Sequence, residues 1–409
     1  MLSQDYLSDI IDSQRKYFVS KKTDLVRESL DIIPVKKGYA TLITGLRRCG
    51  KCTLLIQLQK KENFTGVVYF NFEDIRLSGF EPSDFSRLGR ALTARSDSLI
   101  AFFDEIHLMK GWETFVCDLL KDGWRIFITD TSARLPEVPF AVSMELFTFS
   151  YTEFLDFSRS ASGPDSLTRY LKTGGIPKFV RNEGTSILGN LLDDILVRDI
   201  AVHHSLKDAG ALRQLAVYLL QNTGLPVSAN ALTGRFGIKS CATVLEYFNF
   251  YQNAYLLELI PQFSHSSGVR QRNPKKIYAM DVGLINVASA TEPNLESRLE
   301  NTVYLYLRRK HHTIYYYSGN KCRCDFIAQD ETGGNKTGGN ETCCNEPYRV
   351  VQVCGTLHDE NYRDEVEGLA AAAVELGLKR GTLVTFSQKE VISHGNIQIE
   401  VVPAYEYLK

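Results

Sequence analysis

The sequence of 409 residues contains no apolar run long enough to cross a bilayer, and its start lacks the charged stretch and apolar core of a secretory signal. Its formal net charge is −1, which excludes a strong overall basic field for nucleic acid but leaves room for a local basic patch. The number of cysteines, nine, is odd and the chain is long, so a disulfide framework is not expected. Their spacings also differ from those of the usual zinc sites. We therefore expect a cytoplasmic protein with no membrane association.

Hydrophobic residues make up 44% of the chain and charged residues 23%, which is the balance of an ordinary soluble globular protein. A chain of 409 residues is too long for one ordinary core. The length therefore predicts two or three domains.

A short segment from Thr41 to Leu55, TLITGLRRCGKCTLL, has the pattern of a phosphate-binding loop, G-x-x-x-x-G-K-[ST]. A strand-like run precedes it and a helix-like run follows it, as this motif requires. Gly45 and Gly50 allow the backbone N–H groups to face an anion, and Lys51 reaches the β- and γ-phosphates. The segment therefore predicts ATP binding, and the alternative is a strand–helix turn that binds nothing. The expected nucleotide contacts are Gly45, Arg47, Arg48, Cys49, Gly50, Lys51, Cys52 and Thr53.

One position of the loop differs from the motif. The residue after the lysine ordinarily carries the hydroxyl that holds Mg²⁺, and here it is Cys52. A thiol is a soft ligand, whereas Mg²⁺ is a hard cation that prefers oxygen. Thr53 has a hydroxyl, but one position along a helix turns the side chain by about 100°. The loop therefore predicts nucleotide binding, whereas hydrolysis depends on whether the metal ion tolerates the thiol.

Two carboxylates, Asp104 and Glu105, follow a buried strand-like run at 99–103. Because this run comes one strand and one helix after the loop, it has the place of a Walker B element. Asp104 would hold the Mg²⁺ shell, directly or through water, and Glu105 would polarise the attacking water. The alternative is a core strand with a charged end. Buried strands that alternate with helices predict a doubly wound parallel sheet, with the ligand at the carboxyl ends of its strands.

Five segments together resemble a prokaryotic family of AAA-type P-loop ATPases: GLRRCGK, FFDEIHLMKGW, ITDTSA, FTFSYTEFLDF and YLKTGGIPKFV. The resemblance covers nearly the whole chain, and it is specific in the DEI…W and GG-x-P segments as well as in the loop. It implies an ATPase that uses ATP and Mg²⁺, with a C-terminal winged-helix and nuclease-like region of poorly defined function.

Three positions around the nucleotide depart from the pattern of that family. Besides Cys52, Asp130 stands where the family has the glycine of T-G-S-S, and residues 137–143 lack the arginine that precedes the next strand. Arg134 is the nearest arginine, and we assign it no role in trans. Together the departures predict a weak or lost ATPase whose binding survives through the loop backbone and Lys51.

Residues 227–280 have the outline of a helix-turn-helix followed by a hairpin wing. We expect a short helix at 227–236, a turn at Gly237 and a second helix at 240–251. The second helix is largely apolar, so packing within the chain is an equal alternative to reading DNA. The hairpin carries four cations that could meet phosphates: Arg270, Arg272, Lys275 and Lys276.

The last part of the chain has the outline of a restriction-nuclease core, in which carboxylates hold Mg²⁺ and a lysine steadies the attacking water. Glu300 lies on a predicted helix, Asp325 on a strand and Gln352 on a third strand, but Cys354 stands where the lysine belongs. We expect a degenerate, catalytically silent site, and a small α/β domain with chance carboxylates is an equal alternative. A polar insertion near 329–346 should be a disordered loop.

The sequence thus predicts an α/β P-loop doubly wound sheet of AAA type at 1–160, a helical and winged-helix domain at 161–275 and a nuclease-like α/β domain at 276–409. The leading function is ATP hydrolysis with Mg²⁺, coupled to a DNA or protein partner that the sequence does not name. The alternatives are a non-hydrolysing, nucleotide-dependent DNA-binding or interaction module and a metal-dependent nuclease driven by nucleotide. A homo-oligomer is a further expectation, because rings and dimers of such ATPases supply an arginine in trans.

Overall fold

The computed structural model divides the described residues into two compact units. Met1–Thr148 and Asn253–Tyr255 form the first unit, and Phe149–Gln252 and Leu256–Lys409 form the second. The division into three domains at 160 and 275 stays a prediction. The described residues are 1–21, 23–96, 98–132, 138–182, 185–206, 208–288, 294–319, 322–330 and 347–409. Arg134 and residues 331–346 of the predicted insertion lie outside them.

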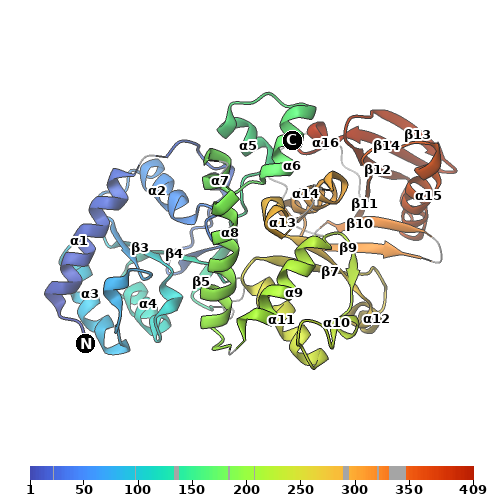
Figure 1. Ribbon diagram of the computed structural model, residues 1–409. Helices are drawn as coiled ribbons and strands as arrows, with labels where there is room; N and C mark the ends of the chain where they lie inside the picture. Colours follow the sequence, from blue (N-terminus) through green and yellow to red (C-terminus); the bar gives the residue numbers. More distant parts are fainter. Residues whose placement is uncertain are drawn as a thin grey trace. The chain divides into compact units, whose positions relative to one another are not determined.

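A five-stranded sheet forms the centre of the first unit, and Figure 1 shows its strands β3, β4 and β5. All five strands are parallel, in the order β2-β3-β4-β1-β5. The strands are β1 Ala40–Thr44, β2 Val68–Asn71, β3 Ile100–Asp104, β4 Arg125–Asp130 and β5 Ala141–Glu145. Every residue of β1 and β3 is buried, as expected for parallel strands that helices cover. The parallel α/β sheet predicted from the sequence is confirmed.

Four helices belong to this sheet: α1 Gln4–Ser20, α2 Lys51–Lys61, α3 Phe85–Thr93 and α4 Trp112–Lys121. Helices α1, α3 and α4 bury their apolar sides in one core with the strands, through residues such as Ile10, Leu88 and Val116. Helix α2 begins directly after the loop and buries Leu54, Leu55 and Leu58. Each large apolar side chain that is fully buried in this way stabilises the sheet by about 1.5–3 kcal/mol.

The strand order brings the polar ends of three strands to one edge of the sheet. Strand β4 pairs on one side with β1, where Thr44 lies opposite Asp130, and on the other with β3, where Asp104 lies opposite Thr129. The loop that follows β1, the carboxylates that end β3 and the polar end of β4 are therefore neighbours. This is the edge at which parallel α/β sheets bind ligands.

Three residues far along the chain return to the first unit. Asn253–Tyr255 belongs to it, although the segments before and after belong to the second unit. The hydroxyl of Tyr255 donates a hydrogen bond of 2.7 Å to Oγ1 of Thr44, the last residue of β1. The base of the loop is thus held by a side chain more than 200 residues away in sequence.

The second unit contains a helical part, a three-stranded sheet and a six-stranded sheet. Its first helices are α5 Tyr151–Ser158, α6 Pro164–Thr173, α7 Pro177–Asn182, α8 Thr185–Asp194, the π-helix Ile195–Val202 and α9 Ala209–Gln221. The antiparallel sheet β6-β8-β7 consists of β6 Pro226–Val227, β7 Leu257–Pro261 and β8 Lys275–Ala279. Within the described residues, no helix has both the length and the apolar composition needed to span a membrane.

The six-stranded sheet has the order β13-β14-β12-β11-β10-β9 and mixes parallel and antiparallel pairs. Its strands are β9 Thr313–Ser318, β10 Arg323–Gln329, β11 Tyr348–Val353, β12 Arg380–Thr385, β13 Glu390–His394 and β14 Ile397–Pro403. The parallel pair β11 and β12 is joined through helix α15 Asp359–Glu375, which packs on the sheet through Val366, Leu369 and Ala373. This part of the unit also contains the helices α13 Val282–Ala288, α14 Leu295–Lys310 and α16 Ala404–Tyr407.

The region predicted as a helix-turn-helix differs from the expectation in detail. The helix predicted at 227–236 is only α10, Ala229–Leu232, because β6 uses Val227 and Thr233 is extended. The second predicted helix is present as α11, Cys241–Asn253. Strands β7 and β8 form the predicted hairpin, and a short helix, α12 Ser267–Arg272, lies in their connection.

Candidate nucleotide site

The loop between β1 and α2 has the backbone geometry that its glycines allow. Gly45 has φ +148°, and a Cβ atom there would lie 2.3 Å from the carbonyl oxygen of Leu146. Gly50 has φ +112° and precedes α2, and within the described chain no side chain caps this helix. The first N–H groups of α2 are therefore available to an anion at the positive end of the helix.

The side chain of Lys51 lies inside the loop. Its Nζ donates to the carbonyl oxygens of Gly45 at 2.9 Å and Leu46 at 3.3 Å, and it lies 3.6 Å from Oε1 of Glu105. Burial would lower the pKa of Lys51, but the negative charge of Glu105 and its neighbours raises it above its ordinary value. The predicted phosphate-binding lysine is thus charged, buried and next to the predicted catalytic carboxylate.

The other predicted contacts of the loop divide into exposed and buried side chains. Arg48 is exposed, and Arg47 pairs with Glu73 through an N–O distance of 2.7 Å. Cys49 is fully buried, and burial raises the pKa of its thiol, so it does not face the loop as a thiolate. Thr53 is half-buried on the first turn of α2.

Arg27 is a buried residue of this region that the sequence did not identify. Its guanidinium donates hydrogen bonds of 2.8 Å to the carbonyl oxygens of Cys49 and Phe147, so it joins the loop to the segment after β5. Its backbone N–H donates to the side chain of Gln57 on α2. Arg27 therefore holds the loop from behind, and its place in an irregular segment left no motif by which to find it.

Cys52 and Asp104 both contact the same tyrosine. The hydroxyl of Tyr69 on β2 donates 2.7 Å to Oδ2 of Asp104 and lies 3.5 Å from the sulfur of Cys52. The hydroxyl of Thr129 hydrogen-bonds to Oδ1 of Asp104. Burial raises the pKa of the Cys52 thiol to about 12, so the sulfur stays protonated near neutral pH. The two residues predicted around Mg²⁺ are thus close to one another, and each carboxylate oxygen of Asp104 already accepts a hydrogen bond from a hydroxyl group.

Glu105 follows β3 in a left-handed backbone conformation, with φ +57°. This conformation is unfavourable for a residue with a side chain, and such strain is frequent at functional sites. Oε2 of Glu105 accepts hydrogen bonds from the N–H of Thr131 at 3.1 Å and from its hydroxyl at 3.2 Å. Burial raises the pKa of Glu105 to about 7, while Lys51 acts in the opposite direction. The carboxylate is therefore fixed in direction and poised near neutral pH.

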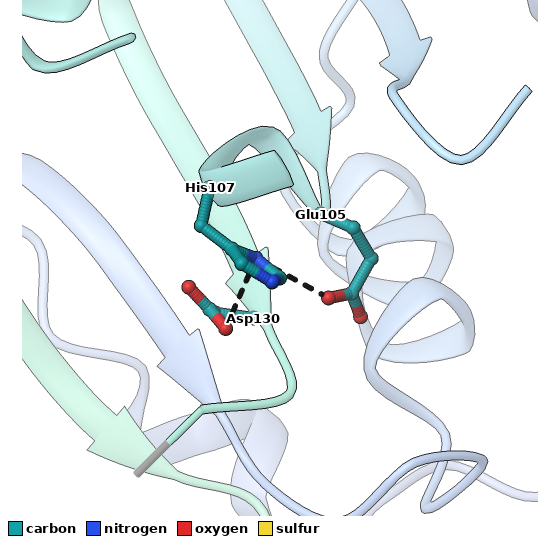
Figure 2. Close-up of side chains that lie close together, drawn as sticks. All are labelled: Glu105, His107 and Asp130. Carbon is teal, nitrogen blue, oxygen red and sulfur yellow. Dashed lines mark ion pairs between the residues drawn. The ribbon is translucent and has the colours of Figure 1, made fainter. Parts of the chain in front are cut away.

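His107 and Asp130 complete a cluster around Glu105 that the sequence did not predict as a site. Figure 2 shows the imidazole of His107 between the two carboxylates. Its Nδ1 lies 3.1 Å from Oδ1 of Asp130 and 3.6 Å from Oε2 of Glu105. The only signals in the sequence were the His of DEIH and the acidic residue in place of a glycine.

A second cluster lies in the second unit, where the structure brings Glu300, Asp325 and Gln352 together. The Nζ atom of Lys276 lies 2.9 Å from Oε1 of Glu300 and 2.8 Å from Oδ1 of Asp325. Gln352 accepts a hydrogen bond from the N–H of Asp325. Burial, followed by the charge of Asp325, raises the pKa of Glu300 to about 7. Lys276, expected at a phosphate contact, is instead nearly buried between these carboxylates. Cys354, which stands where the lysine of a nuclease belongs, is also buried.

The three remaining cations of the predicted basic patch hydrogen-bond to the backbone of their own connection. Arg270 donates to the carbonyl of Ser264, Arg272 to that of Gly268, and Lys275 to those of Gln271 and Asn273. Arg272 is exposed, whereas Arg270 and Lys275 are half-buried.

Comparison with known proteins supports the interpretation of the first unit. Residues 37–155 match the family model described as "AAA domain", and residues 164–295 match one described as "Domain of unknown function (DUF8612)". An uncharacterized protein of Methanocaldococcus jannaschii, MJ1544, is 27% identical over 428 residues, which cover 95% of this chain and 92% of the relative. An uncharacterized protein of Haemophilus influenzae is 28% identical over 71% of this chain and 80% of its own length.

Several solved structures also match, at low TM-scores. A Signal Transduction ATPase with Numerous Domains protein from Pyrococcus horikoshii has 14% identity and a TM-score of 0.29, covering 72% of this chain but only 47% of its own. AMPPCP-bound DnaA from Aquifex aeolicus has 16% identity and a TM-score of 0.28, covering 55% of this chain and 85% of its own. The match to the AAA domain model thus covers most of the first unit, in which the parallel sheet and its loop lie.

Proposed function

We propose that the first unit binds ATP at the loop from Gly45 to Lys51 and hydrolyses it slowly. The observation that carries the proposal is the distance of 3.6 Å between Nζ of Lys51 and the Glu105 carboxylate, at the edge where three parallel strands end. Lys51 would exchange its two carbonyl contacts for the β- and γ-phosphates, and the first N–H groups of α2 would bind phosphate oxygens.

We assign to Glu105 the role of positioning the water that attacks the γ-phosphate. Thr131 holds Oε2 with two hydrogen bonds, so Oε1 faces Lys51 and would accept a hydrogen bond from a water near the γ-phosphate. This positions the nucleophile for in-line attack, which is the main contribution of a protein to phosphoryl transfer.

The residues at the predicted metal position fit Mg²⁺ poorly. Cys52 offers a protonated sulfur, and both oxygens of Asp104 already accept hydrogen bonds from Tyr69 and Thr129. A hard cation has no preference for such a donor set. We therefore assign no step to a protein-bound Mg²⁺ and attribute the expected slow hydrolysis to this misfit.

The test is ATP hydrolysis and ATP affinity, measured for the wild type, Cys52→Thr and Glu105→Gln. We expect the wild type to bind ATP and turn over slowly, Cys52→Thr to be faster, and Glu105→Gln to bind without turnover. If Glu105→Gln hydrolyses as fast as the wild type, Glu105 is not the residue that positions water. If no variant binds ATP, the proposal fails entirely.

A second candidate function is a nucleotide-dependent interaction module that binds DNA or protein through a winged helix. It rests on the three-stranded sheet with α10 and α11, on the cations Arg270 and Arg272 in the β7–β8 connection, and on Lys275 at the start of β8. DNA binding that weakens with salt and with Arg272→Glu would support it. Salt-independent DNA binding, or no DNA binding, would mean that this region instead contacts a protein or packs within the chain. The protein contacted in that case could be a second copy of the chain in a homo-oligomer.

We also propose that the nuclease-like cluster is catalytically silent. Lys276 occupies the space between Glu300 and Asp325, in which a metal-dependent nuclease would need a divalent cation. Purified wild type should show no Mg²⁺-dependent DNA cleavage above that of Asp325→Ala. Cleavage that disappears in Asp325→Ala would instead support the nuclease hypothesis.

A further inference from the structure

The side chains of Glu105, His107 and Asp130 have the spacing of ligands around one metal ion. One ligand atom from each lies within 4.8 Å of the other two. The separations are 3.1 Å from Nδ1 of His107 to Oδ1 of Asp130 and 3.6 Å from Nδ1 to Oε2 of Glu105. With metal–ligand bonds of about 2.0–2.2 Å, two ligands at right or tetrahedral angles lie roughly 3.0–3.5 Å apart. The separation of the Glu105 and Asp130 oxygens is given by the 4.8 Å limit alone, so an ion would draw these two carboxylates together, and Oε2 of Glu105 would share the ion with its hydrogen bonds from Thr131.

The charge and burial of the cluster favour a cation. Glu105 is 6% exposed and Asp130 is fully buried, and Asp104, 8% exposed, belongs to the same strand end. Lys51 contributes one positive charge to this region, and a divalent ion would contribute two more beside three carboxylates. Oδ2 of Asp130 has no hydrogen-bond partner among the residues that the structure describes. A buried carboxylate oxygen without a partner is costly, so a ligand for it is expected.

The type of donor indicates the type of ion. One imidazole and two carboxylates suit Mn²⁺, Fe²⁺ or Zn²⁺, whereas Mg²⁺ prefers oxygen ligands alone. We propose that Glu105, His107 and Asp130 form a binding site for a divalent transition-metal ion at the carboxyl ends of β3 and β4. This site is distinct from the position predicted for Mg²⁺ at Cys52 and Asp104. Two departures of the chain then have opposite effects, since Cys52 removes an oxygen ligand and Asp130 adds one.

The competing explanation is a direct ion pair in which protonated His107 bridges the two carboxylates without a metal. The two cases differ in a direct titration of nucleotide-free protein with Mn²⁺, monitored by the loss of the free-ion EPR signal. Mn²⁺ is chosen because it has little preference for thiols, so the nine cysteines should not compete. The metal site predicts one tight Mn²⁺ ion per chain.

Two nearly isosteric variants, His107→Gln and Asp130→Asn, remove one ligand each. We expect both to weaken Mn²⁺ binding by more than about tenfold, a loss that even the outer partners of metal ligands can cause. His311→Gln is the matched control, because Nδ1 of His311 lies 3.0 Å from the single carboxylate of Asp330 and belongs to no three-ligand group in the described chain. This control should bind Mn²⁺ like the wild type.

Pulsed EPR of the wild-type complex gives a second readout that needs no variant. An imidazole ligand should produce ¹⁴N coupling to Mn²⁺, and His107→Gln should abolish that coupling. The proposal is overturned if the wild type binds no Mn²⁺, if both variants bind it unchanged, or if the bound ion shows no nitrogen coupling. Because the titration contains no nucleotide, its failure is distinguishable from a failure of ATP binding, although the site shares Glu105 with the proposed ATPase.

Discussion

Lys276 lies between two carboxylates of the second unit, and its removal should destabilise that unit strongly. Its Nζ is 2.9 Å from Glu300 and 2.8 Å from Asp325, and the three side chains are only 12%, 18% and 13% exposed. Lys276→Met keeps most of the side-chain volume but leaves both carboxylates without their counter-ion. Breaking a buried ion pair in this way costs about 3–5 kcal/mol. For a unit of this size the loss corresponds to a fall in melting temperature of roughly 6–20 °C.

The assay must report on the second unit alone. The two tryptophans, Trp112 and Trp124, both lie in the first unit, so their fluorescence should change little. Hydrogen exchange of α14 and β10, measured by mass spectrometry, reports directly on the elements that carry Glu300 and Asp325. We expect faster exchange in both elements and an earlier unfolding transition by circular dichroism.

Lys389→Met is the matched control for this prediction. Lys389 also forms an ion pair, at 2.6 Å from Glu406, but its side chain is 66% exposed. Exposed pairs contribute little, so this variant should be indistinguishable from the wild type. If Lys276→Met lost no more stability than Lys389→Met, the reasoning would be refuted, because the buried ion pairs would then contribute nothing to the stability of the second unit.

The pH dependence of Lys276→Met gives a second check on the same contacts. Burial and the charge of Asp325 raise the pKa of Glu300 from 4.5 to about 7. The folded protein therefore holds this proton more tightly than the unfolded chain, so stability falls as the pH rises from about 4.5 to about 7. Without Lys276 the penalty on the charged form increases. The destabilisation by Lys276→Met should accordingly be smaller at pH 5 than at pH 8.

Two further substitutions test the loop of the first unit. Gly45→Ala would place a Cβ atom 2.3 Å from a backbone oxygen, so we expect a loss of about 1–3 kcal/mol by tryptophan fluorescence and no binding of a fluorescent ATP analogue. Gly89→Ala is the control, since a Cβ atom there lies at an ordinary contact distance of 3.5 Å from one ring atom of Phe115. Unchanged ATP binding by Gly45→Ala would contradict the loop geometry. Arg27→Met leaves the buried carbonyl of Cys49 and the partly buried carbonyl of Phe147 without their donor, and it should cost about 1–3 kcal/mol of stability with weaker ATP binding. Wild-type affinity and stability would show that Arg27 does not support the loop.

The sequence predicted those parts of the first unit that depend on neighbouring residues. The loop, the strand that ends in Asp104 and the parallel sheet all follow from local patterns of glycine, apolar runs and carboxylates. Tyr69 was missed because its contact with Asp104 joins residues 35 apart, on strands that become neighbours only through the order β2-β3-β4-β1-β5. His107 was missed for a similar reason, since its partner Asp130 lies on the next strand of the sheet.

In the second unit the sequence predicted three members of the buried polar cluster correctly but misplaced the fourth, Lys276. Glu300, Asp325 and Gln352 were predicted to lie together, and the structure brings them together. Lys276 was interpreted as a surface cation because a basic residue in a hairpin is usually exposed. Its position depends on contacts with Glu300 on α14 and Asp325 on β10, which no local pattern encodes.

The hydrogen bond from Tyr255 to Thr44 limits how the protein can be divided for experiments. A fragment that ends at residue 148 would contain the whole sheet of the first unit but would lose the tyrosine that anchors the last residue of β1. Thr44 directly precedes Gly45, so the fragment could fold and still hold its loop loosely. On the proposed function, a first unit isolated in this way would bind ATP more weakly than the full chain, and Tyr255→Phe in the full chain would reproduce that defect without any truncation.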